Sequence, residues 1–139
     1  MILKTYEFLK KTKFINSIYL LYGDNEGYQN EIQSKILGLK KKAKIHRYDE
    51  KEFFENYDTI LSELYNKSFF ETEKIILISR VTDKIIQFIY EILEKKLEST
   101  TIILKAGILE KKSKLRSIFE KNKSLTCIPF YADDQKTLS

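Results

Sequence analysis

Two glycines, Gly23 and Gly27, flank a polar turn that follows the first apolar run of the sequence. A Walker A phosphate loop needs such glycines, but it also needs a Gly-Lys-Ser/Thr ending whose lysine and hydroxyl hold phosphates and magnesium. The residues after Gly27 are Tyr28 and Gln29, and the three-glycine spacing of a dinucleotide site is missing as well. The sequence therefore predicts that Gly23, Asp24 and Gly27 form a turn and a helix entry rather than a nucleotide site.

The single histidine, His46, and the single cysteine, Cys127, both lie in predicted strands. One cysteine excludes an intramolecular disulfide or a multi-cysteine metal site, and one histidine excludes histidine-rich zinc ligation. A phospho-receiver domain needs an aspartate at the end of its third strand, where this chain has Ser79 and Arg80. We expect His46 and Cys127 to be packing residues, and we expect no catalytic centre, metal or cofactor.

Two adjacent aromatic residues, Phe69 and Phe70, lie between a helix predicted to end near Tyr65 and a strand predicted to begin near Lys74. Such a connection is normally polar. Adjacent residues of a regular element cannot both point into one core, so we expect at least one ring to be exposed. Exposed aromatic side chains often anchor protein interfaces, although a loop tucked against the domain is the alternative.

The densest basic cluster consists of four lysines after Gly38, namely Lys40, Lys41, Lys42 and Lys44. Cations suit the carboxyl end of a helix, so a solvated helix end explains the cluster. The alternative is a nucleic-acid-binding face, since clustered lysines attract phosphate. The cluster lacks interleaved aromatic residues for base stacking, so we expect only weak, non-specific contact with DNA.

Strand-like apolar runs alternate with amphipathic helical segments along the chain. The predicted strands are 18–22, 43–48, 74–79, 101–105 and 125–130, and the predicted helices are 24–39, 53–64, 82–97 and 112–121. Thr82 or Asp83 can cap the third helix, and Pro129 marks the end of the last strand or a sheet edge. This order predicts an α/β fold with a five-stranded, mainly parallel sheet and right-handed crossovers.

A chain of 139 residues with 42% hydrophobic residues is long enough for one globular domain. We expect this domain to span residues 1–130, with an amphipathic N-terminal piece packed outside it and an exit segment at 131–139. No apolar run reaches about 18 residues, and charge interrupts the first residues before a signal-peptide core forms. These features predict a cytoplasmic protein.

Three segments together resemble the N-terminal domain of the delta subunit of bacterial DNA polymerase III, the wrench of the clamp loader. They are Tyr22-Gly23-Asp24, the run from Lys67 to Ile78, and the run from Leu109 to Arg116. The most specific is the Ser-Leu-Phe type motif before the third strand, which stands here as Ser68-Phe69-Phe70. The resemblance extends over essentially the whole chain.

The resemblance implies an AAA+-like fold with a degenerate phosphate loop at Gly23, Asp24 and Gly27, and no ATP hydrolysis. It also implies that Phe69 and Phe70, next to Ser68, insert into a cleft on the ring-shaped sliding clamp (the beta subunit) and help to open the ring. The phenylalanine at position 69, where the family commonly has leucine, enlarges this plug.

The resemblance further implies partners for the longer family protein. Its helical and collar domains, which we expect to be absent here, join the ATPase and delta-prime subunits. The alternative function belongs to another class, since it is that of an enzyme: a nucleotide-binding α/β enzyme with an atypical phosphate loop.

Overall fold

A parallel five-stranded sheet forms the centre of the computed structural model, which describes residues 18–24, 26–39, 44–65, 73–95, 100–110 and 112–129. The strands are β1 (Ile18–Tyr22), β2 (Lys44–Asp49), β3 (Lys74–Ser79), β4 (Thr100–Lys105) and β5 (Thr126–Pro129). Their order is β2-β3-β4-β1-β5, and all four pairings are parallel. The predicted five-stranded α/β class is therefore confirmed, and Pro129 ends an edge strand as expected.

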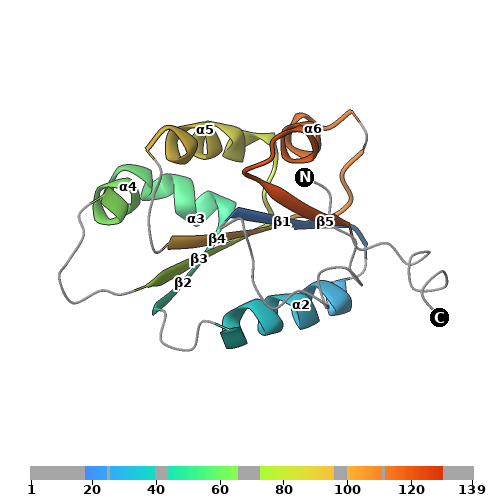
Figure 1. Cartoon of the computed structure of the whole chain (residues 1–139). Coiled ribbons are helices and arrows are strands. Elements are labelled where there is room, and N and C mark those ends of the chain that lie inside the picture. The colour runs from blue at the N-terminus through green and yellow to red at the C-terminus, as the bar shows by residue number, and fades with distance from the viewer. Residues whose placement is uncertain are drawn as a thin grey trace.

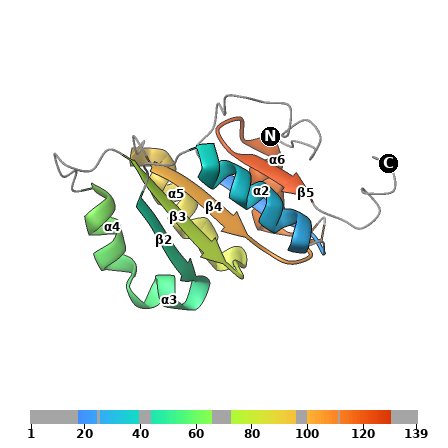
Figure 2. The same ribbon diagram turned by 90° about the horizontal axis from the view of Figure 1, so that it is seen from below.

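The helices form a layer on each face of the sheet, as Figure 1 shows. They are α2 (Glu26–Leu39), α3 (Glu50–Glu55), α4 (Tyr57–Tyr65), the 3-10 turn η1 (Asp83–Ile85), α5 (Ile86–Lys95) and α6 (Lys114–Lys121). Among the described helices, α2 lies on one face of the sheet, in front of it in Figure 2, and the others lie toward the opposite face. No helix in the described ranges is long and apolar enough to cross a membrane.

Alternation along the strands divides the core into two clusters, because successive strand side chains point to opposite faces. Burial on both faces explains why the inner strands are continuous apolar runs. The smaller cluster contains Tyr19, Leu21, Ile32, Ile36, Ile75, Leu77, Ile103 and Ile128, and the larger includes Leu20, Tyr22, Phe53, Ile76, Ile78, Phe88, Ile102, Leu104, Leu115 and Phe119. Both helical layers are thus anchored to the same sheet.

The single helix predicted over residues 53–64 is wrong, because the chain forms two helices, α3 and α4, on either side of Asn56. The Asn56 backbone N–H donates to the Phe53 carbonyl at 3.3 Å, and its side-chain Nδ2 donates to the Glu52 carbonyl at 3.1 Å. An asparagine side chain competes in this way with regular helical bonds. The Asn56 carbonyl then accepts from Ile60 N at 2.9 Å, so the helix restarts at once and the apolar face continues.

Thr82 caps the segment before α5, as predicted, by accepting a hydrogen bond from Lys84 N at 3.3 Å. Asp83 has a different role, since its Oδ1 accepts from Leu115 N at 3.2 Å and from Ser113 Oγ at 3.4 Å. This carboxylate therefore connects η1 to the start of α6. The N-terminal amphipathic piece and residues 131–139 lie outside the described residues, so the proposed domain limits stay predictions.

Candidate functional site

The turn after β1 has the conformation expected from its glycines. Gly23 has φ of 124°, a left-handed conformation that glycine adopts without steric cost. Gly27 lies in the first turn of α2, and Asp24 is exposed between them. The three residues thus form a turn and a helix entry at the carboxyl end of the sheet, where ligands bind in open α/β folds.

Backbone hydrogen bonds join this turn to the residues that follow β4. The Gly23 amide donates to the Gly107 carbonyl at 2.9 Å, and the Ala106 amide donates to the Leu21 carbonyl at 2.8 Å. A phosphate loop uses its backbone amides to surround phosphate oxygens. Here the Gly23 amide is already bound to a protein carbonyl.

Gln29, a residue that sequence reasoning missed, completes this connection. Its side-chain Nε2 donates to the Gly23 carbonyl at 3.2 Å and to the Ala106 carbonyl at 3.3 Å, and the residue is only 3% exposed. Its position three residues before the buried Ile32 on α2 was the available signal, because residues at this spacing share a helix face. A buried amide thus lies beside this turn. A working phosphate loop has a lysine and a hydroxyl group there instead.

An open pocket of about 750 Å³ lies above this turn and contains charges of both signs. Asp24 and Glu26 stand at the amino end of α2, where carboxylates stabilise the helix dipole and repel phosphate. Lys105 also lines the pocket, and its Nζ donates to Asn30 Oδ1 at 2.6 Å. Burial lowers the pKa of Lys105, while nearby Glu26 acts in the opposite direction.

The end of β3 contributes Ser79 and Arg80 to the same pocket. Arg80 has a φ of 57°, and its guanidinium lies 3.7 Å from Asp49 Oδ2. Within the described ranges no group of three histidine, cysteine, aspartate or glutamate residues is arranged to hold a metal ion. A cationic side chain thus occupies the end of β3.

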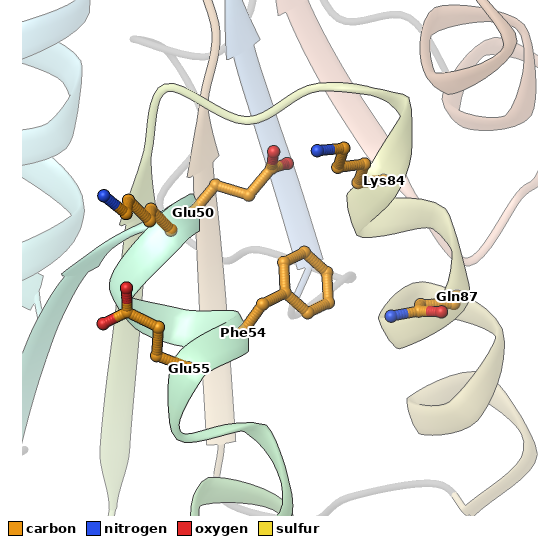
Figure 3. Close-up of a pocket in the computed structure, with 6 residues that line it drawn as sticks. Glu50, Phe54, Glu55, Lys84 and Gln87 are labelled. Atoms are coloured by element: carbon orange, nitrogen blue, oxygen red, sulfur yellow. The ribbon is translucent and has the colours of Figure 1, made fainter.

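A second pocket, of about 730 Å³, lies between α3 and α5 (Figure 3). Figure 3 shows the Phe54 ring directed from α3 toward the space before α5, with Lys84 and Gln87 on the far side. Glu50 lines the pocket but is 8% exposed, and its carboxylate accepts from Thr82 N at 2.7 Å and Thr82 Oγ1 at 2.8 Å. Glu50 therefore joins α3 to the loop after β3.

His46 and Cys127 cannot act together. His46 lies on β2 and Cys127 on β5, at opposite edges of the sheet. Cys127 is fully buried, and burial raises the pKa of its thiol to about 11. The burial of Cys127 agrees with its interpretation as a packing residue, whereas His46 is only partly buried on the edge strand β2.

Ser68, Phe69 and Phe70 lie outside the described residues, but both flanks of their segment are described. Lys74 Nζ donates to the Glu63 carbonyl at 3.2 Å, which joins the start of β3 to the last turns of α4. β3 runs from this point to the pocket at Arg80. The start of β3, which follows this segment in the sequence, therefore lies at the end of the strand opposite the glycine turn.

The basic cluster after Gly38 is described only at Lys44, which is exposed at the start of β2. Lys44 N donates to the Glu73 carbonyl at 3.1 Å. Lys40, Lys41 and Lys42 lie outside the described residues, so their proposed contact with DNA stays a prediction.

Comparison with solved structures finds the same architecture in the Bacillus subtilis DNA clamp loader delta protein. The TM-score is 0.64 at 14% sequence identity, over 89% of this chain and 42% of that chain. The chain has the fold of a clamp-loader delta protein. This chain spans less than half the length of the Bacillus subtilis protein. No family model and no curated protein matches the sequence.

The delta-like fold confirms the predicted resemblance at the level of architecture. Five parallel strands with helices on both faces correspond to the expected α/β class. The roles expected for Ser68, Phe69 and Phe70, which lie outside the described residues, stay predictions.

Proposed function

We propose that this chain is a clamp-binding module of a DNA-replication clamp loader, equivalent to the first domain of a delta subunit. The observation that carries the proposal is the delta-like fold, together with the Ser68-Phe69-Phe70 motif between α4 and β3. The partner is the ring-shaped sliding clamp. In a longer delta protein of the DNA polymerase III holoenzyme, the ATPase and delta-prime subunits are further partners.

In this proposal Phe69 and Phe70 enter an apolar cleft of the clamp and help to separate one ring interface. Burying each phenylalanine contributes roughly 1.5–3 kcal/mol. The flanks support such a lever, because Leu64 on α4 and Ile75 on β3 are both buried in the core. Because both flanks are fixed in the core, a pull on Phe69 and Phe70 acts on the packed sheet.

The proposed module has no catalytic activity of its own. The Gly23 amide is bound to the Gly107 carbonyl, and no lysine and hydroxyl follow Gly27, so the loop has little with which to hold the terminal phosphates of ATP. ATP hydrolysis is then a task of partner subunits in the cytoplasm.

Surface plasmon resonance against the immobilised cognate clamp tests the proposal. The double change Phe69→Ala, Phe70→Ala is expected to weaken binding by about a hundredfold or more, since anchor residues lose about 2 kcal/mol or more each and each 1.4 kcal/mol is tenfold. A matched control is Tyr90→Ala, which removes an aromatic ring that is 55% exposed on α5. This control is expected to leave the affinity unchanged.

A melting curve separates an interface role from a core role. An unchanged melting temperature with weakened clamp binding supports the anchor, whereas a collapsed melting temperature assigns the rings to the core. Charge reversal of Lys40, Lys41, Lys42 and Lys44 provides a second comparison and is expected to leave clamp binding nearly intact. Wild-type affinity in the double phenylalanine variant would refute the proposal.

A further inference from the structure

A second basic segment, besides the lysine cluster after Gly38, lies outside the proposed clamp contact. Residues 110–124 contain six basic and two acidic residues, a net charge of +4, whereas the whole chain carries +5. This segment contains α6 and its two flanks. Its charge therefore belongs to one part of the surface.

Four lysines of this segment are exposed, namely Lys112, Lys114, Lys121 and Lys123. Lys114 and Lys121 are seven residues apart, so they share one face of α6, about 10 Å apart along its axis. The opposite face is buried through Leu115 and Phe119. We call these four lysines the α6 lysine row.

The acidic residue on α6 does not neutralise this row. Glu120 Oε1 instead pairs with Arg116 Nε at 2.7 Å. Arg116 is held further by its Nη1, which donates to the Leu109 carbonyl at 3.0 Å, and by its place 5.3 Å from the centre of the Tyr22 ring. Arg116 and Glu120 thus form an internal pair, and the lysines make no ion pair with another described residue.

Helix stability explains Lys121, which lies in the last turn of α6 where a cation suits the helix dipole, but it does not explain the rest of the row. Lys114 lies in the first turn of α6, which has no acidic residue, and a cation there opposes the helix dipole. Four like charges close together also repel one another. An external polyanion is the partner that removes both costs.

The geometry points to double-helical DNA, bound through its phosphate backbone, as the ligand of the α6 lysine row; we propose this as a second binding surface. Phosphates of one strand advance about 3.4 Å along the duplex axis, so the spacing of Lys114 and Lys121 matches every third phosphate. The aromatic residue of α6, Phe119, is fully buried. Base stacking, which single-strand binders use, is therefore not available from α6.

Fluorescence anisotropy of a short labelled duplex, measured across a salt series, tests this surface. The wild type is expected to bind without sequence preference in the micromolar range or weaker at physiological salt. The pair Lys114→Gln, Lys121→Gln is expected to reduce the slope of log affinity against log salt by about 1.8, because each lost phosphate contact removes about 0.9. At low salt its affinity falls by about tenfold or more.

The matched control is Lys51→Gln, Lys84→Gln, which removes the same charge from two exposed lysines on α3 and η1. The control is expected to change the slope little, and Lys114→Arg, Lys121→Arg is expected to restore binding. Equal losses in both glutamine pairs would assign binding to net charge and overturn the proposal. So would undetectable duplex binding by the wild type, tighter binding to a single strand, or equal affinity for polyglutamate.

The clamp measurement keeps this inference separate from the proposed function. The Lys114 and Lys121 variants leave Phe69 and Phe70 intact and are expected to bind the clamp like the wild type.

Discussion

The side-chain amide of Gln29 connects Gly23 to Ala106, which lies 77 positions after Gln29 in the chain. Through these two hydrogen bonds α2 fastens the glycine turn to the end of β4. The turn that open α/β proteins use for ligands is here stabilised by a protein group. This contact explains the local geometry and leads to the first prediction.

Replacing Gln29 by alanine is expected to lower the free energy of unfolding by about 1–3 kcal/mol, because two buried carbonyls lose their donor. Urea unfolding followed by circular dichroism measures the change. Gln87→Ala is the matched control, since Gln87 is an exposed amide on α5 and its loss is expected to cost little. Equal costs for Gln29 and Gln87 would show that the buried amide does not hold the turn.

Mg-ATP is expected to give no binding heat in isothermal titration and no shift in melting temperature. The Gly23 amide is occupied, and Asp24 and Glu26 bring negative charge to the site. A ligand that binds the folded state raises stability by mass action, so the melting curve is an independent readout. Micromolar binding with phosphate release would favour the nucleotide-binding enzyme over the clamp module.

The strands were predictable because their pattern is local. The runs at Ile18–Tyr22 and Lys74–Ser79 have the predicted limits, since strands buried on both faces are apolar without interruption. Short connections between strands and helices then favour a parallel order. Periodicity and short connections therefore predicted the five-stranded α/β class, whereas the strand order β2-β3-β4-β1-β5 came from the structure.

The features that sequence reasoning missed depend on distant or competing contacts. The Gln29 amide reaches Ala106, and the Asp83 carboxylate reaches Leu115, 32 residues away. The helix break at Asn56 results from a side chain that bonds its own backbone neighbours, a choice that apolar spacing does not report. The spacing of apolar residues shows which face of a helix is buried. It does not show which polar side chain on that face forms a hydrogen bond with a distant part of the chain.

Removing the Glu50 carboxylate is expected to destabilise the fold by about 2–3 kcal/mol. Glu50→Ala deletes both hydrogen bonds to Thr82, and bonds to charged groups are worth about 1.5–3 kcal/mol each before relaxation. Glu55→Ala, an exposed carboxylate of the same pocket, is the control and is expected to change stability little.

A double-mutant cycle with Thr82→Ala tests whether the effect of Glu50 passes through Thr82. A coupling energy of about 0.5 kcal/mol or more is expected for residues in direct contact. A cycle that is additive would place the cost of Glu50→Ala elsewhere, for example in lost packing beside Phe54.

The Cys127 thiol is expected to resist alkylation in the folded protein. Burial raises its pKa from 9.0 to about 11, and the thiolate is the reactive form. Two pKa units lower the thiolate fraction about a hundredfold at neutral pH, and burial on β5 limits access further. Iodoacetamide labelling followed by mass spectrometry, in native buffer and in urea, measures the ratio of rates; equal rates would contradict the burial.

The same shift predicts a pH dependence of stability with a definite sign. The folded state favours the protonated thiol, so its contribution is complete below about pH 9, the pKa of the unfolded thiol, and is lost as the pH rises toward 11. Burial also raises the pKa of Tyr48 and Tyr57, which adds to the alkaline loss. Urea midpoints of the wild type and Cys127→Ala, compared from pH 7 to 10, isolate the thiol, because the alanine variant keeps the tyrosine contribution. The difference between the two proteins is expected to shrink above about pH 9, and a constant difference would show that Cys127 does not titrate with folding.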